Sequence, residues 1–195
     1  MSGLTFKETM SGPVTLGASD PEAGAADPNA KNLAIHCEIW IDDIDRFVAD
    51  REHTGSITGS VEYEAFGGGE LPVTLGIFNL FSPGGPSERL MQYRLAFEHD
   101  GTLYFLDGAK HVHDDPGVDV WKDTTTLHTV LHEGSGASGP VVGAGILSLG
   151  VEALTRMMTT MRATDGGLGP LVKFGRLFLG SLWEEYGKDK IGGAR

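Results

Sequence analysis

Apolar and polar residues alternate in short runs along most of the chain, and glycine-rich turns separate the runs. The alternation is clearest at residues 33–41, 57–66 and 91–98, where almost every second residue is apolar or glycine. Successive side chains of a β-strand point to opposite faces of the sheet, so a period of two is typical of a strand with one buried side. Each of these three segments is therefore predicted to be a β-strand.

Residues 91–112 predict a β-hairpin. His99-Asp100-Gly101 separates two alternating runs, and Asp-Gly is among the strongest short-range signals for a tight hairpin turn. Further strands are predicted at residues 4–10, 14–16, 73–81, 120–131 and 141–149. The pattern as a whole predicts about eight strands joined mostly by short turns.

Helical periodicity is confined to three segments. Residues 42–50 place three apolar side chains on one face of a short helix, and acidic residues occupy its first turn. Residues 151–161 and 170–186 carry apolar stripes at helical spacing, and Pro170 suits a first helical position. Residues 20–32 are polar and predict a long loop, which is either a lid over a binding site or a plain surface loop.

The order of these elements predicts the fold class. A parallel sheet needs a helix between successive strands, and residues 52–150 show none, so the strands are expected to pair antiparallel. We therefore expect a mainly β protein: an antiparallel up-and-down, calycin-like β-barrel with a short helix and a C-terminal amphipathic helix. Residues 1–195 fit a single domain, with residues 151–187 as a helical extension packing on the barrel.

Composition narrows the possible partners and compartments. The formal charge of −12 repels phosphate backbones, so no nucleic acid is expected as a partner. The chain has a single cysteine, Cys37, on the apolar face of a predicted strand, where a buried structural thiol is expected. No secretory signal is visible and no apolar run approaches the ~20 residues of a membrane span. We expect a cytoplasmic protein without membrane insertion.

Three segments carry a resemblance to a known kind of domain. Residues 67–73, 76–81 and 114–127 are similar to a domain that accompanies cholesterol-oxidase-like flavoproteins of the GMC oxidoreductase type in bacterial multidomain proteins. The likeness extends from about residue 4 to residue 150 and, more loosely, into the C-terminal helix. It implies a steroid or lipid context and a GMC-type flavoprotein as a partner, but it brings no catalytic residues.

No cofactor is expected in this chain. A flavin or nicotinamide domain begins with a strand, a Gly-x-Gly-x-x-Gly turn and a helix, and no such unit occurs. The predicted barrel also resembles calycin and allene-oxide-cyclase barrels, which hold apolar ligands in the lumen. That likeness concerns the fold, and a fold by itself does not determine function.

Asp107 and His111 are the candidate catalytic residues. If Leu103 and Phe105 face the core, the period of two places Asp107 and His111 on that face as well. A carboxylate inside a barrel is desolvated, which suits it to proton transfer beside a carbonyl group. The opposite face, which includes Tyr104, is equally apolar, so the orientation of this strand stays open.

His111 and His113 also share a strand face, as two imidazole ligands of one metal ion would. The pair lies at a strand end beside a turn, where exposed polar residues are common. A solvated strand end is the better interpretation, and no metal is predicted.

A set of aromatic residues and one amide are the candidate ligand-binding residues. Tyrosine hydroxyls and indole N–H groups orient a polar atom of a ligand inside an otherwise apolar cavity. The alternative is ordinary core packing for the aromatic residues and a strand-locking hydrogen bond for the amide. The candidates are Trp40, Tyr63, Asn79, Tyr93, Tyr104 and Trp121.

These observations leave three hypotheses for function. The first is a barrel that binds a small apolar molecule, such as a sterol or another lipid, as an accessory to lipid or steroid oxidation. The second is a cofactor-free isomerase or cyclase that uses a cavity aspartate or histidine. The third is an interaction domain that forms a homodimer or docks a partner through the C-terminal helix.

Overall fold

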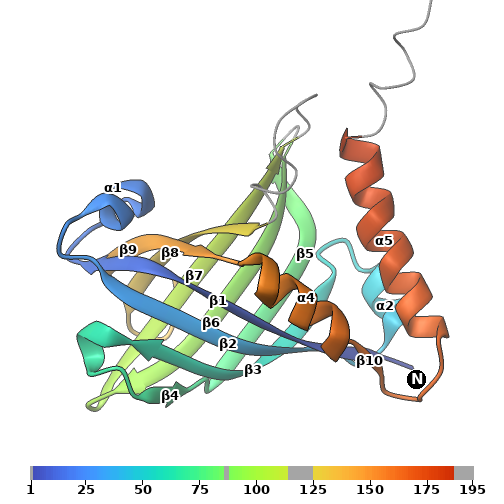
Figure 1. The fold of residues 1–195 in the computed structure, drawn as a ribbon, viewed down its shortest axis with the longest axis horizontal. Helices are drawn as coiled ribbons and strands as arrows, with labels where there is room; N and C mark the ends of the chain where they lie inside the picture. Colours follow the sequence, from blue (N-terminus) through green and yellow to red (C-terminus); the bar gives the residue numbers. More distant parts are fainter. Residues whose placement is uncertain (1, 86–87, 114–124, 187–195) are drawn as a thin grey trace, which may run out of the picture.

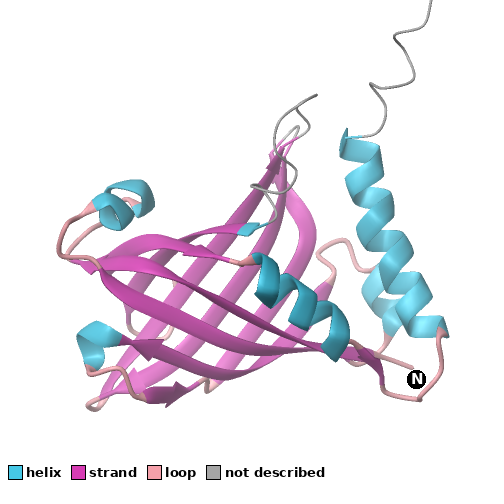
Figure 2. Ribbon diagram, viewed as in Figure 1, coloured by secondary structure: helices cyan, strands magenta, loops and turns pink. Residues whose placement is uncertain are grey.

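In the computed structural model, residues 2–85, 88–113 and 125–186 are described. Eight long strands dominate these residues and are strung along the chain with short connections (Figures 1 and 2). They are β1 (Leu4–Leu16), β2 (Lys31–Ile41), β3 (Thr54–Tyr63), β5 (Leu75–Gly85), β6 (Glu88–His99), β7 (Thr102–His113), β8 (Thr126–Glu133) and β9 (Val141–Ser148). Two short strands, β4 (Glu70–Pro72) and β10 (Arg162–Ala163), extend the sheet beside β3 and β1.

Each long strand pairs antiparallel with the next one along the chain, and β9 then pairs antiparallel with β1. This last pairing joins Val14 to Gly145 and Leu16 to Gly143, which closes the sheet into a barrel. The prediction of a mainly β, antiparallel up-and-down barrel is therefore confirmed. Between β6 and β7, Asp100 and Gly101 both have positive φ angles, 48° and 76°. Positive φ at both central residues is what a type I′ hairpin turn requires, as the Asp-Gly signal predicted.

The pairing of β1 with β9, which we call the seam of the barrel, requires glycine at two positions. A Cβ atom at Gly145 would overlap the carbonyl oxygen of Pro13, and one at Gly12 would overlap the carbonyl oxygen of Ile146. Glycine at both positions therefore lets the first and last barrel strands approach closely enough to form their hydrogen bonds.

Four helices and one 3₁₀ turn complete the secondary structure of the described residues. They are α1 (Pro21–Ala26), α2 (Ile44–Ala49), η1 (Glu64–Phe66), α4 (Val151–Thr160) and α5 (Gly169–Tyr186). The helices α2, α4 and α5 occur where helical periodicity predicted them, whereas α1 lies within the segment predicted to be a loop. Figure 1 shows α2, α4 and α5 gathered at one end of the barrel and α1 at the other. Among the described residues, no helix has the length and apolar character needed to cross a bilayer.

The two ends of the barrel are filled differently. At the end away from α5, Tyr63, Phe66 and Tyr104 pack ring against ring, and the Tyr63 hydroxyl donates a hydrogen bond to the carbonyl oxygen of Val14 at 3.0 Å. At the other end, α5 inserts Phe174 between Phe6 of β1, at 5.7 Å between ring centroids, and Phe47 of α2, at 6.3 Å. The barrel is therefore plugged by its own side chains at one end and capped by helices at the other.

We expect Gly145→Ala to lower the free energy of unfolding by about 1–3 kcal/mol, because the added methyl group must displace β1 at the seam. Urea denaturation followed by tryptophan fluorescence measures the change. The matched control is Gly136→Ala, where an added Cβ meets no atom within 4 Å and the change should stay within about 0.5 kcal/mol. Equal stability of the two variants would contradict the role assigned to the seam.

Candidate functional site

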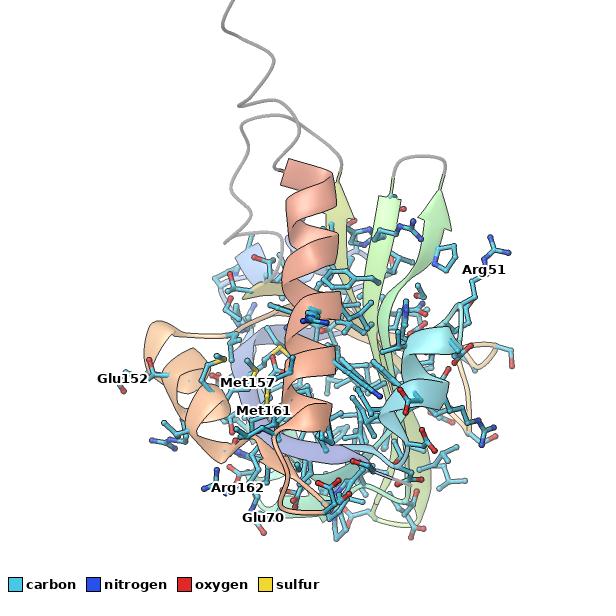
Figure 3. The ribbon with its side chains drawn as sticks, turned by 90° about the vertical axis from the view of Figure 1, so that its right-hand side faces the viewer. Arg51, Glu70, Glu152, Met157, Met161 and Arg162 are labelled. Carbon is cyan, nitrogen blue, oxygen red and sulfur yellow. The ribbon has the colours of Figure 1, made fainter. Side chains whose placement is uncertain are left out.

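A cavity of about 260 Å³ lies at the helix-capped end of the barrel. Its walls are mainly apolar and come from both the strands and the helices. Side chains that form them include Phe6, Phe78 and Leu80 from the barrel and Met157, Leu171 and Phe174 from the helical segment. Figure 3 looks onto this end of the molecule: α5 crosses in front of the strands, and Met157 of α4 and Met161, directly after that helix, lie beside it.

Three polar side chains from three different strands meet in the wall of this cavity: Glu8 of β1, Tyr93 of β6 and Lys110 of β7. The Lys110 Nζ atom donates to Glu8 Oε1 at 3.0 Å, and the Tyr93 hydroxyl donates to Glu8 Oε2 at 2.7 Å. Lys110 Nζ also lies 3.4 Å from the Tyr93 hydroxyl oxygen. We call these three residues the polar triad.

The alternation of the strands places the polar triad inside. Glu8 lies between Phe6 and Met10 on the inward face of β1, and all three side chains are almost fully buried. Lys110 follows Leu106 on the inward face of β7. The side chains of Lys110 and Glu8 are only 1% and 2% exposed, so both charged groups depend on each other rather than on water.

Burial of a charge is costly unless the group is paired and hydrogen-bonded. In the polar triad each carboxylate oxygen of Glu8 accepts one hydrogen bond, which offsets part of that cost. The Tyr93 hydroxyl is fully buried, and desolvation together with the Glu8 carboxylate raises its pKa well above the usual 10.0. Burial, with Glu8 as a second cause, also raises the pKa of the nearby Cys37 thiol. Cys37 is therefore a protonated structural thiol and not a nucleophile.

Asp107 does not reach the cavity. Strand β7 turns Tyr104 and Leu106 inward, so Leu103 is exposed and Asp107 lies on the outer surface of the barrel. There its Oδ1 atom is 3.8 Å from Arg94 Nε, and about a third of each side chain is exposed. Asp107 could act as a base in the cavity only if Leu103 and Phe105 faced the core, and the strand has the opposite orientation.

His111 shares the outer face with Asp107. Its Nδ1 atom lies 2.6 Å from Glu88 Oε1, and its ring packs edge-on against His128 at 5.4 Å between centroids. The ring does not line the cavity, so His111 cannot act on a molecule bound there. The side chain of His113 lies outside the described residues, and the described residues contain no group of three or more side chains arranged to hold a metal ion.

Of the five candidate ligand-binding residues that the structure describes, Tyr93 alone is found in the wall of the cavity. Tyr63 and Tyr104 pack at the opposite end of the barrel, and Trp40 lies between the inward-facing Ile39 and Ile41, on the outer face of β2.

Asn79 and Trp121 complete the candidates. The Asn79 amide donates to the carbonyl oxygen of Glu52 at 3.2 Å and to Thr54 Oγ1 at 3.0 Å. It therefore joins β5 to the start of β3, which is the structural alternative considered for this residue. Trp121 lies outside the described residues.

Sequence reasoning missed Glu8 and Lys110, although the alternating pattern contained a signal for both. Glu8 is a charged residue in phase with Phe6 and Met10, and Lys110 is in phase with Leu106 and Val112. One charged residue on each of two apolar strand faces, with opposite signs, is typical of a buried ion pair. The sequence contained no comparable signal for the part of the cavity wall that the helices form, because that part depends on how the helices dock on the barrel.

Stability should fall progressively as the pH rises above 9. In the native state the pKa of Cys37 is raised above its usual 9.0, that of Tyr93 is raised above 10.0, and that of Tyr63 is raised by burial to about 12. The unfolded chain therefore releases these protons first, which favours unfolding in alkali. Urea midpoints measured from pH 7 to 11 test this. Cys37→Ala should remove the part of the loss that begins near pH 9, and a flat profile would contradict the burial described here.

Comparisons of the chain with protein-family models, with curated proteins and with solved structures find no match. The resemblance to domains that accompany GMC-type flavoproteins therefore stays a prediction from the three sequence segments. The closed barrel is established by its own strand pairing. What the protein does has to be argued from the chemistry of the cavity and its polar triad.

Proposed function

We propose that the protein binds a small, mainly apolar ligand in the cavity at the helix-capped end of the barrel. The observation that carries the proposal is the combination of a mainly apolar cavity of about 260 Å³ with the buried polar triad in its wall. Ligand sites in proteins have this composition: apolar walls provide affinity, and a few polar groups fix the orientation of the ligand.

The cavity volume limits the size of the ligand. An engineered apolar cavity of about 150 Å³ binds benzene, which has six carbon atoms. By that standard about 260 Å³ accommodates on the order of ten to twelve non-hydrogen atoms. A four-ring sterol exceeds this volume unless α5 moves outward, so the proposed ligand is a smaller apolar molecule than the sterol suggested by the sequence.

Helix α5 provides the route to the cavity. It is held by Phe174 in the aromatic cluster with Phe6 and Phe47, by Phe178 against Phe81 of β5, and by an ion pair between Lys173 and Asp45 of α2. Both charged groups of that pair are largely exposed, and such pairs contribute little to stability. Opening of this segment therefore requires fewer buried contacts to break than opening of the barrel itself.

The cellular role follows from the resemblance rather than from the cavity. Domains that accompany GMC-type flavoproteins would place this protein beside lipid or steroid oxidation in the cytoplasm, holding an apolar substrate or product for a flavoprotein partner. The third hypothesis, an interaction domain that dimerises through the C-terminal helix, stays a prediction that no observation favours.

Filling the cavity should abolish binding. Met91 is 5% exposed and lines the cavity, so Met91→Trp places an indole ring in the volume that the ligand needs. Isothermal titration calorimetry with 1-chlorononane as the probe should show binding to the wild type and at least ~10-fold weaker binding to the variant. Leu103→Trp, on the exposed outer surface, is the control and should bind as the wild type does. Equal affinity of all three proteins would place the ligand elsewhere, and no binding to the wild type would remove the proposal.

A second candidate function is proton transfer on a bound ketone, and Glu8 replaces Asp107 and His111 as its base. The observation that favours it is a carboxylate, a phenol and an ammonium group in the wall of one apolar cavity. In this reaction Glu8 removes a proton from the carbon beside the carbonyl group, and the electron pair of the C–H bond moves to the carbonyl oxygen near Lys110. The reverse step returns a solvent-derived proton to the same carbon.

Exchange of ketone protons with heavy water tests this second function. We expect the wild type to accelerate deuterium incorporation beside the carbonyl of 2-decanone by at least ~10²-fold over buffer, and Glu8→Gln to lose that acceleration. Proton NMR of the ketone follows the reaction, and circular dichroism checks that the variant is folded. A ketone that binds without faster exchange would show that the cavity is a binding site only.

A further inference from the structure

Among the described residues, one strong hydrogen-bond donor of the polar triad has no acceptor. A protonated lysine has three N–H groups, and those of Lys110 reach Glu8 Oε1 and the Tyr93 hydroxyl in the bonds that the structure shows. The hydrogen of the Tyr93 hydroxyl is already given to Glu8 Oε2. The Lys110 Nζ atom also lies 4.9 Å from the centroid of the Tyr93 ring, but this ring offers no oxygen or nitrogen acceptor to the third N–H.

In this buried site an unsatisfied N–H group costs more free energy than an unused lone pair on an oxygen atom. The Lys110 side chain is 1% exposed and packs among mainly apolar walls, so an acceptor for its third N–H has to come from within the cavity. Both Glu8 oxygens already accept a hydrogen bond, and an oxygen with one free lone pair is a smaller liability than an unpaired N–H group. The triad therefore favours a ligand that accepts a hydrogen bond over one that only donates.

The charges of the triad limit the kind of acceptor. Lys110 and Glu8 neutralise each other at 3.0 Å, so the pair has no net charge. A ligand carboxylate next to it would leave one uncompensated negative charge in a desolvated site and would lie close to the Glu8 carboxylate. A neutral oxygen acceptor has neither disadvantage, and a charge-assisted N–H···O bond is among the stronger hydrogen bonds in proteins.

We propose that the ligand of this cavity is a neutral, mainly apolar carbonyl compound of about ten to twelve non-hydrogen atoms. Its carbonyl oxygen accepts a hydrogen bond from the third N–H group of Lys110. This inference rests on the proposed function, since it names the chemical class of ligand for the same cavity. The apolar remainder of the ligand lies against the aromatic and methionine side chains that separate the triad from α5.

Three probes of similar size separate the possibilities: 2-decanone as the neutral carbonyl, decanoate as the carboxylate, and 1-chlorononane as an apolar molecule with a very weak acceptor. Calorimetric titration of the full chain at neutral pH should give 2-decanone a dissociation constant about 10-fold lower than that of 1-chlorononane. Decanoate should bind at least ~10-fold more weakly than 2-decanone, because of the Glu8 charge.

The variant that tests the origin of this preference replaces both charges together. Removing Lys110 alone leaves the Glu8 carboxylate buried without a cation, which endangers folding, whereas apolar replacement of both partners is often neutral. Loss of Glu8 would also free the Tyr93 hydroxyl to donate to a ketone, so the variant includes Tyr93→Phe. In Glu8→Leu/Tyr93→Phe/Lys110→Met the ratio of the two dissociation constants, 1-chlorononane over 2-decanone, should fall from about 10 to about 1. The matched control is Arg94→Gln/Asp107→Asn, which removes an ion pair from the outer face of β6 and β7 and should leave the ratio unchanged.

The outcomes distinguish this inference from the proposed function. If 1-chlorononane binds and 2-decanone binds no better, the cavity holds apolar ligands but Lys110 does not select a carbonyl, and the inference is overturned. Tighter binding of decanoate than of 2-decanone overturns it as well and points to a carboxylic acid. A preference that survives in Glu8→Leu/Tyr93→Phe/Lys110→Met overturns it too, because the selecting group then lies elsewhere. If none of the three probes binds the wild type, the proposed function fails, and the inference fails with it.

Discussion

The pairing of β1 with β9 is the constraint on which the rest of the structure depends. Without it the sheet would have two open edges, and backbone groups on both edges would lack partners. Closure also fixes the direction in which the side chains of β1 point, and this strand carries both Phe6 under α5 and Glu8 of the polar triad. Glycine at positions 12 and 145 makes the close approach possible. The pairing of β1 with β9 thus determines where Glu8 of the polar triad lies.

Side chains fill one end of the barrel interior, and the other end contains the cavity. Rings of Tyr63, Phe66 and Tyr104 fill one end, so that end contributes to stability as an ordinary core does. The other end keeps its inward side chains apart, and α4 and α5 complete the enclosure. The buried ion pair lies on the hollow side. Polar groups that serve only stability are better replaced by apolar ones, so their position beside the cavity supports a role toward a ligand.

Much of the fold was predictable from local patterns, because strand alternation, the Asp-Gly turn and helical stripes are each contained in a few neighbouring residues. The orientation of β7 was not predictable in this way, since Leu103 and Phe105 on one face are as apolar as Tyr104 and Leu106 on the other. Phe105 is buried although it lies on the outer face, which shows why apolar character alone could not decide the orientation. The opposite charges of Glu8 and Lys110 contained the missing information, but only as a pair brought together by barrel closure.

The cavity itself was beyond local reasoning, because its wall combines β1, β5 and β6 with a helix more than 150 residues away from β1 in the chain. Helix α1 was missed for a different reason. Its Asp20 N-cap and Pro21 are ordinary start signals, but the alanine and glycine that follow give it no apolar stripe.

Phe174 belongs at once to α5, to the cavity wall and to the aromatic cluster with Phe6 and Phe47. A molecule that touches this ring makes contacts that exist only while α5 is docked. Occupancy of the cavity and docking of the helix are then coupled by one interaction free energy, and each must strengthen the other by the same factor. A ligand bound in the cavity would therefore also hold the C-terminal helix in its docked position, so that the outer surface of the molecule would depend on what the interior contains.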